Sequence, residues 1–372
     1  MAISAESPAL GNTGLDWLAA LLKEELAPYP GRAAAVARMV TACIVTMLAV
    51  MIFKLPNGFL AVFYALAISR ADPRSSVRNG FAIVLGNVAG LVIALAGIVL
   101  FINYPLLRFL FVVSAFFLAF FVTRTLVNYG MAFGFSIILV AASSVNIIWA
   151  RPGPLRPDIG ITLWTSFGMI LGTLASVLAD WIFSPRTPPV DLPPSCPQMF
   201  VADAFSNRAY QVFAIKGCLA ATICYVIWAG LGWPGLGVCT VTCVIAAPVS
   251  TPGSSRQRLT TRILGLLTGG VICGIGSQIF ILPSADSIAG FALPFAIVSA
   301  AAAWVVTSSP RLSYFGRQMA LAYYLTIFQG WGINASLATS RDRLMGILLG
   351  LLVMWLMFDA AGARPRWKGE VS

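Results

Sequence analysis

Histidine is absent from this chain of 372 residues, and charged residues make up only 10% of it. Without histidine the chain lacks the commonest general base, metal ligand and proton shuttle, so we expect no hydrolytic or zinc chemistry and no enzyme activity. A soluble domain carries about 25% charged residues, which this chain does not have. We therefore expect a protein embedded in the lipid bilayer, with no cofactor, no metal and no nucleic-acid partner.

Cysteine is also sparse, with seven residues, an odd number. Six of them lie inside apolar runs, at spacings that are not typical of disulfide frameworks or zinc sites. We interpret them as reduced packing residues.

Apolar residues, by contrast, make up 59% of the chain and form long runs. A helix that spans a bilayer takes about 20 apolar residues. Six runs precede a proline-rich stretch and six follow it: 33–53, 58–69, 80–102, 106–123, 130–149 and 159–183, then 210–230, 235–249, 263–282, 288–307, 316–333 and 343–358. These runs predict an all-α, polytopic membrane protein with about twelve transmembrane helices. The second run of each set is short, which predicts a broken, strongly tilted or protein-buried helix.

The two sets of runs look like copies of one another. Pro73-Arg74-Ser75-Ser76 recurs 179 residues later as Pro252-Gly253-Ser254-Ser255, and Gly86 and Gly90 recur as Gly265 and Gly269. Because each set has an even number of spans, the copies have the same orientation, which predicts two parallel six-helix repeats. The predicted organisation is an amino end at 1–32, a first repeat at 33–183, a proline-rich connector at 184–209, a second repeat at 210–359 and a basic tail at 360–372.

The amino end carries an amphipathic pattern, because Leu15, Leu18, Leu22 and Leu26 fall on one helical face before Pro28. We interpret this stretch as an interfacial helix. The alternative is a helix that docks on a partner.

Basic residues are distributed unequally between the two sides of these spans. With the amino end inside, 18 of the 24 Lys and Arg residues lie on the cytoplasmic side. By the positive-inside rule, this distribution predicts that both termini and the connector are cytoplasmic.

Small residues recur four apart within the spans, as in Gly168/Gly172, Gly265/Gly269 and Gly346/Gly350. Such pairs allow helix backbones to approach closely. Packing is the simplest interpretation, and a rocking interface or an unwound helix is the functional alternative.

Ionisable side chains are costly within a membrane, so each one needs a reason. Lys216, Asp180 and Asp359 lie near span ends, and we expect them to reach the cytoplasmic interface. The functional alternative for Lys216 is a fixed charge that attracts an organic anion. No carboxylate is expected at mid-membrane, so the sequence names no residue for energy coupling.

The run 316–333 and the residues just before it are unusually polar and aromatic. Such groups need a partner in lipid, which is either a neighbouring helix or an aromatic substrate. The candidate substrate-binding residues, with Lys216, are Tyr314, Arg317, Gln318, Tyr323, Tyr324 and Gln329.

Three charges precede the last run. Arg341, Asp342 and Arg343 form either a local ion-pair clamp or an anion gate, and Asp180 is a further candidate for gating or ion pairing.

A set of dispersed motifs resembles one known family. The motifs are Asp203-Ala204-Phe205-Ser206-Asn207, Phe213-Ala214-Ile215-Lys216, Trp233-Pro234-Gly235, Ala303-Trp304-Val305, Ser309-Pro310-Arg311 and Gly346-Ile347-Leu348-Leu349-Gly350, with weaker matches at Pro30-Gly31-Arg32 and Tyr104-Pro105-Leu106-Leu107-Arg108. Together they resemble the fusaric acid resistance family of inner-membrane efflux proteins, also called aromatic acid exporters, and within it the multidrug-resistance branch.

The resemblance implies a multi-pass subunit in the bacterial inner membrane. It would work with a periplasmic adaptor (membrane fusion) protein and an outer-membrane channel, and homo-oligomerisation stays open. Two features depart from the family pattern. The sizeable soluble domain that usually separates the halves is either naturally absent or removed at 184–209, and Ser254 stands where an acidic residue is expected.

The sequence thus predicts an efflux transporter for aromatic or hydrophobic organic acids or drug-like compounds. The alternative is a passive organic-anion channel distantly similar to plant malate channels, with Lys216, Arg317 and Arg343 flanking its pore. Substrate identity, energy source and oligomeric state are left open.

Overall fold

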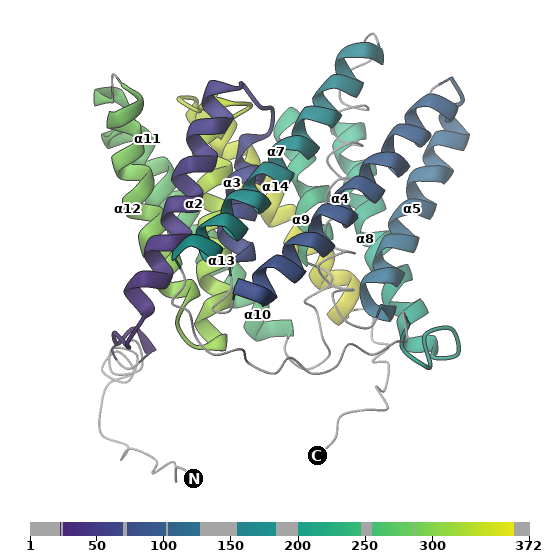
Figure 1. Ribbon diagram of the computed structural model, residues 1–372. Coiled ribbons are helices and arrows are strands. Elements are labelled where there is room, and N and C mark those ends of the chain that lie inside the picture. Colours follow the sequence, from purple (N-terminus) through teal and green to yellow (C-terminus); the bar gives the residue numbers. More distant parts are fainter. Residues whose placement is uncertain are drawn as a thin grey trace, which may run out of the picture.

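The described part of the chain is a bundle of helices (Figure 1). The computed structural model describes residues 23, 25–69, 73–101, 103–126, 155–183, 200–246, 255–285 and 287–360. Several predictions lie outside these residues, among them nearly all of the interfacial helix, the span 130–149, most of the connector, the side chain of Asp359 and the tail beyond residue 360.

The helices follow the predicted runs closely. The first half contains α2 (Arg32–Ile52), α3 (Gly58–Ile68), α4 (Pro73–Phe101), α5 (Pro105–Thr125) and α7 (Leu155–Phe183). The second half contains α8 (Arg208–Leu231), η1 (Pro234–Gly237), α9 (Val238–Ala246), α10 (Ser255–Gly265), η3 (Leu266–Ile275), α11 (Gly276–Phe280), η4 (Leu282–Ser284), α12 (Ile288–Val306), α13 (Pro310–Ile327), β1 (Phe328–Gln329), β2 (Gly332–Ile333), α14 (Leu337–Trp355) and η5 (Leu356–Ala360).

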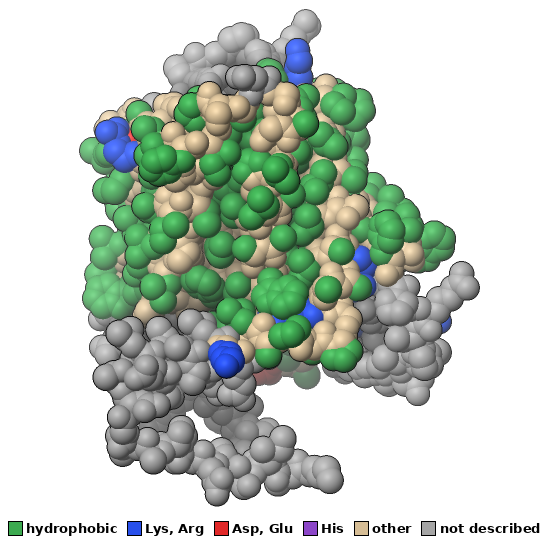
Figure 2. All heavy atoms as spheres, turned by 90° about the vertical axis from the view of Figure 1, so that its left-hand side faces the viewer, with side chains coloured by type: hydrophobic (Ala, Val, Ile, Leu, Met, Phe, Trp, Pro, Cys, Tyr) green, Lys and Arg blue, Asp and Glu red, His purple; other side chains and the backbone are tan. Residues whose placement is uncertain are grey.

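Seven of the described helices are long and apolar enough to cross a membrane: α2, α4, α5, α7, α8, the continuous series from α10 to η4, and α12. The outer surface of the bundle agrees with this, because large apolar side chains such as Phe280, Leu293 and Ile297 are exposed. Figure 2 shows mainly apolar side chains on the face formed by α11, α12 and α2. The chain is therefore an all-α, multi-pass membrane protein, as predicted.

The short second helix of the first half is buried within the protein. Nine of the eleven residues of α3 are buried, although the helix is too short to cross a bilayer of about 30 Å. Helices that pack around it on all sides replace lipid, so the prediction of a protein-buried helix is confirmed for α3.

Two glycines each allow a pair of helices to pack closely. A side chain at Gly172 of α7 would collide with the main-chain oxygen of Ala61 in α3, and a Cβ at Gly350 of α14 would lie 2.7 Å from the oxygen of Cys239 in α9. Both members of the second pair follow those of the first by 178 residues. The predicted packing role of these glycines is confirmed, since only a residue without a Cβ permits such close helix contacts.

The two halves meet along two similar helix pairs and where α3 packs against α13. Helix α5 of the first half packs against α8 of the second, and α12 of the second half packs against α2 of the first. At the second contact the guanidinium of Arg32 stacks 4.4 Å from the ring centroid of Trp304. Figure 1 shows that α2 begins and η5 ends at the same, lower end of the bundle.

Helix α13 ends earlier than the predicted run 316–333. Helix α13 ends at Ile327. Phe328 then pairs with Ile333 in a hairpin of two short strands, β1 and β2, and the turn between them includes Gly330 at φ 61°. Gln329 therefore lies in β1 and is exposed, which corrects its placement on a membrane helix. Apolar composition extends through this segment, but glycines at 330 and 332 favour the turn over the helix.

Candidate functional site

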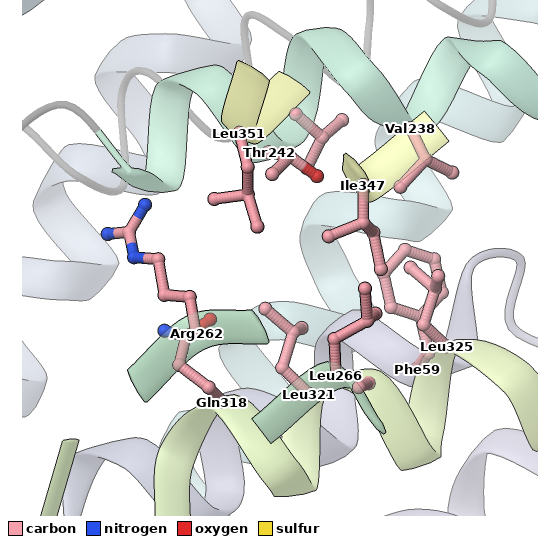
Figure 3. Close-up of a pocket in the computed structure, with 12 residues that line it drawn as sticks. Phe59, Val238, Thr242, Arg262, Leu266, Gln318, Leu321, Leu325, Ile347 and Leu351 are labelled. Atoms are coloured by element: carbon pink, nitrogen blue, oxygen red, sulfur yellow. The ribbon is translucent and has the colours of Figure 1, made fainter. Parts of the chain in front are cut away.

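A pocket lies among six helical segments, mostly from the second half of the chain (Figure 3). Its volume is about 490 Å³ including the open mouth. The lining side chains are Phe59 of α3, Val238, Val241 and Thr242 of α9, Arg262 of α10, Leu266 of η3, Gln318, Leu321, Ala322 and Leu325 of α13, and Ile347 and Leu351 of α14.

Helical periodicity brings these side chains to one place. Gln318, Ala322 and Leu325 are spaced four and three residues apart, so one face of α13 forms a wall of the pocket. The lining is apolar apart from Thr242, Arg262 and Gln318, and it contains no Asp or Glu. An apolar cavity with a few polar groups is the usual form of a small-molecule site.

Arg262 forms the charged end of this pocket. Its side chain is 7% exposed, and its guanidinium donates a hydrogen bond to the hydroxyl of Tyr314 while lying 5.3 Å from the centroid of that ring. In Figure 3 the guanidinium stands at one end of the cavity, away from the aliphatic residues at the other. A guanidinium is the side chain best suited by shape and charge to pair with a carboxylate or sulfonate.

Two glycines and a stretch of π-helix allow α10 and η3 to pack closely against α13. A Cβ at Gly265 would lie 3.1 Å from the main-chain nitrogen of Met319, and one at Gly269 would lie 2.7 Å from its carbonyl carbon. Directly after Gly265 the chain becomes a π-helix, η3 (Leu266–Ile275), which contains Gly269. Stretches of π-helix inside longer helices occur frequently at functional sites.

Of the predicted substrate-binding residues, Tyr314 and Gln318 lie beside this pocket. Arg317 is half-buried on the same helix and does not line the cavity. Arg262 was not among the substrate-binding residues predicted from the sequence, where it counts as one of the cytoplasmic basic residues and lies in a segment that resembles the family. Its role was not visible there, because its contact with Tyr314 joins residues 52 positions apart.

Tyr323 and Tyr324 lie in the core and not along the pocket. Tyr324 donates a hydrogen bond to Ser299 Oγ at 2.9 Å, and both rings pack against Phe295 of α12. In the structure the partner of these two tyrosines is thus the neighbouring helix.

Lys216 lies apart from the pocket, on α8. Its Nζ is 6.0 Å from the ring centroid of Phe358 in η5, and its side chain is half-buried. The structure does not bring Lys216 together with Tyr314 and Gln318.

Arg341, Asp342 and Arg343, near the start of α14, lie at the end of the bundle opposite Arg262 and have separate roles. Arg341 pairs with Asp342 at 2.8 Å, and a hydrogen bond from Trp233, followed by the charge of Arg341, lowers the pKa of Asp342 against the effect of its partial burial. Arg343 donates hydrogen bonds to the main-chain oxygens of Leu325, at 2.6 Å, and of Phe328. Because those oxygens belong to the end of α13, Arg343 caps that helix.

Asp180 is fully buried within the protein, which corrects the expectation that it reaches solvent at the interface. Its Oδ1 lies 3.3 Å from Nε of Arg38 on α2. Because both side chains are buried, the positive charge of Arg38 takes the place of water in stabilising the carboxylate of Asp180.

Comparison with known families gives a match in the first half of the chain. Residues 41–155 match the family described as fusaric acid resistance protein-like. The resemblance inferred from the dispersed motifs is confirmed, although those motifs were denser in the second half. No solved structure matches the chain.

Curated relatives carry the name multidrug resistance protein MdtO. The chain is 35% identical over 175 residues to the protein of that name from Escherichia coli and 35% identical over 176 residues to that from Shigella flexneri. Each alignment covers 47% of this chain and 25% of the relative. The chain therefore spans about a quarter of the length of the curated relatives that it matches.

Proposed function

We propose that this chain is the membrane part of an efflux transporter for aromatic or hydrophobic organic acids, and that it performs no covalent chemistry. The name of the relatives, multidrug resistance protein, supports export from the cell. The matched family, fusaric acid resistance protein-like, supports an organic acid as the substrate class.

The observation that carries this proposal is the pocket beside Arg262. Aliphatic side chains and Phe59 form its walls, and a buried guanidinium forms one end. An amphiphilic anion matches both features, because its ring can occupy the apolar part while its carboxylate pairs with Arg262. A cation finds no counter-charge, since none of the lining residues is acidic.

The architecture supports two parallel repeats with both termini in the cytoplasm. Gly172 with Ala61 and Gly350 with Cys239 make the same helix contact at one constant offset. The paired interfaces, α5 with α8 and α12 with α2, support two similar units, which we propose are related by an axis along the membrane normal. The pocket takes Phe59 from the first unit and its other lining residues from the second.

The organisation of the family supports a wider assembly. We propose that the chain lies in the bacterial inner membrane and works with a periplasmic adaptor and an outer-membrane channel. In that arrangement the pocket receives substrate from the cytoplasm or the inner leaflet.

Growth of cells that lack the protein tests the proposal. We expect deletion to sensitise cells to hydrophobic weak acids, and expression of the wild-type chain from a plasmid to restore growth. Arg262→Gln is expected to fail in this rescue, while Arg341→Gln, at the exposed ion pair, is expected to succeed. Greater sensitivity to lipophilic cations than to weak acids would contradict the proposed substrate class.

A further inference from the structure

Arg343 of α14 carries a positive charge that has no counter-ion among the described residues. Its Nη1 donates hydrogen bonds to the main-chain oxygens of Leu325, at 2.6 Å, and of Phe328. Its other two nitrogens, Nε and Nη2, donate to none of the described residues. The neighbouring carboxylate, Asp342, is paired with Arg341. Two thirds of the guanidinium nitrogens are therefore available to a ligand, although the side chain is half-buried.

This guanidinium lies directly beyond the end of the pocket that is far from Arg262. Leu325, whose carbonyl it binds, lines the cavity, and so does Ile347, one turn after Arg343 on α14. In Figure 3, Leu325 and Ile347 stand at the end of the cavity away from Arg262. Residues 343, 347 and 351 are spaced four apart, so Arg343 extends the row of lining residues Ile347 and Leu351 along α14.

Apolar packing continues from the pocket to Arg343. Leu344, the next residue along the chain, packs in one cluster with Leu266 and Ala322, which both line the cavity. A rise of about 1.5 Å per residue places Arg343 about 6 Å along α14 from the nearest lining residue of that helix. The apolar cavity thus has Arg262 at one end and, one helical turn past the other end, a second guanidinium.

We infer that Arg343 is a second anion site, with which an organic acid released from Arg262 pairs before it leaves on the periplasmic side. This inference rests on the proposed function and topology, and it adds the exit end of the path. A half-buried charge without a counter-ion is costly, so it needs a partner. The described part of the chain supplies none for Arg343, whereas a carboxylate or sulfonate does.

The cap that Arg343 forms on α13 leaves room for this second role. One nitrogen, Nη1, serves both main-chain oxygens, so the edge formed by Nε and Nη2 is open to a bidentate contact with an acid. A lysine at this position would keep the charge and a donor for the helix end but would not offer that edge. The two roles of Arg343 are therefore separable by substitution.

Exchange measured from each face of the membrane tests the inference. Right-side-out vesicles expose the periplasmic face and inverted vesicles the cytoplasmic face. Both are loaded with saturating unlabelled naphthalenesulfonate, which stays ionised, and receive the labelled compound outside. We expect Arg343→Lys to raise the KM for exchange about tenfold at the periplasmic face and less than about twofold at the cytoplasmic face, because the bidentate contact is lost.

Arg341→Gln, at the exposed ion pair two residues away, is the matched control, and we expect it to change neither KM. The thermal midpoint of unfolding in detergent is measured alongside, and Arg343→Lys is expected to keep it near that of the wild type because the cap on α13 remains. An unchanged KM at the periplasmic face overturns the inference. An equal rise at both faces also overturns it, since loss of a merely structural contact would have that effect.

Chemical protection of the wild-type chain needs neither a variant nor transport. Phenylglyoxal modifies accessible guanidinium groups, and mass spectrometry follows the reaction at each arginine. We expect unlabelled naphthalenesulfonate to slow the reaction at Arg343 but not at Arg341. Inorganic phosphate at the same concentration is expected to have little effect, because it has no apolar body to lie beside Leu325 and Ile347.

Three results of this experiment would contradict the inference. Arg343 would fail as an anion site if it did not react at all, or if it reacted at the same rate with and without the sulfonate. Equal protection by phosphate would show a general anion or lipid-headgroup site in place of a site on the path of an organic acid. The experiment therefore decides the question even if Arg343→Lys does not accumulate in the membrane.

The two failures are distinguishable. Wild-type vesicles that show no exchange from either face would count against the proposed function, while the protection experiment still reports on the anion site. Exchange by wild-type vesicles together with an unprotected Arg343 would leave the proposed function standing and remove Arg343 from the path.

Discussion

Arg262 on α10 donates a hydrogen bond to the hydroxyl of Tyr314 on α13 and stands at the end of a cavity that is otherwise mostly apolar. Arg262 is the only charged residue among the described lining residues of the pocket. The pair therefore places a positive charge and an aromatic ring at one end of the cavity. An incoming carboxylate would compete with the tyrosine hydroxyl for the guanidinium. Substrate binding is therefore expected to separate the pair.

Replacement of Arg262 by Gln is expected to weaken binding of an aromatic carboxylate to the purified chain. Hydrogen bonds to charged groups contribute about 1.5–3 kcal/mol, which corresponds to a loss of affinity of about ten- to hundredfold. Equilibrium binding of a labelled carboxylate in detergent measures this loss. Arg341→Gln, at the other end of the bundle, serves as the control, and equal losses in both variants would show that Arg262 has no specific role.

Replacement of Gly172 by Ala is expected to lower the thermal midpoint of unfolding in detergent, because the new methyl group meets the main-chain oxygen of Ala61. Overpacking of this kind costs about 1–3 kcal/mol. Gly160→Ala on the same helix is the matched control, since a Cβ at Gly160 meets nothing within 4 Å. There we expect no loss, or a gain of about 0.5–1 kcal/mol from helix propensity. Equal midpoints for the two variants would contradict the packing account.

Lys216 is expected to serve transport more than stability. Lys216→Ala should lose export while its abundance in the membrane stays near that of the wild type, whereas a lysine that only reaches the interface would tolerate replacement by Arg. Export of a labelled aromatic acid from cells, with immunoblots of membranes, measures the two effects. Survival of export in both Lys216→Ala and Lys216→Gln would remove Lys216 from the mechanism.

The basic residues predict the topology. A reporter that is active only in the periplasm is expected to be silent at Ser372 and active after Pro283, since the 18-to-6 distribution places both termini in the cytoplasm. The opposite pattern would place Ser372 in the periplasm and contradict the topology that the basic residues predict.

Hydropathy and glycine spacing predicted the helices because both report on the local environment of each residue. The runs 33–53 and 159–183 became α2 and α7, and Gly172 packs as its spacing indicated. The end of α13 was misplaced, because apolar composition continues through Phe328 into the hairpin, where glycines set the backbone.

The site was predictable only in part. Tyr314 and Gln318 stood out as polar groups in an apolar run, but Arg262 did not, because an arginine near a span end looks like a topological signal. The burial of Asp180 depends on Arg38, a residue 142 positions away, so its chemistry follows from helix packing that the sequence does not display.

Flux through liposomes that contain the purified chain tests the central claim most directly. The assay compares a labelled aromatic carboxylate with labelled tetraphenylphosphonium, a lipophilic cation, at equal pH on both sides. We predict saturable carboxylate movement above that of protein-free liposomes, which Arg262→Gln abolishes, and no movement of the cation above that of protein-free liposomes. Saturable cation movement without carboxylate flux would contradict the account, and carboxylate flux that never saturates would show a passive channel in place of a transporter.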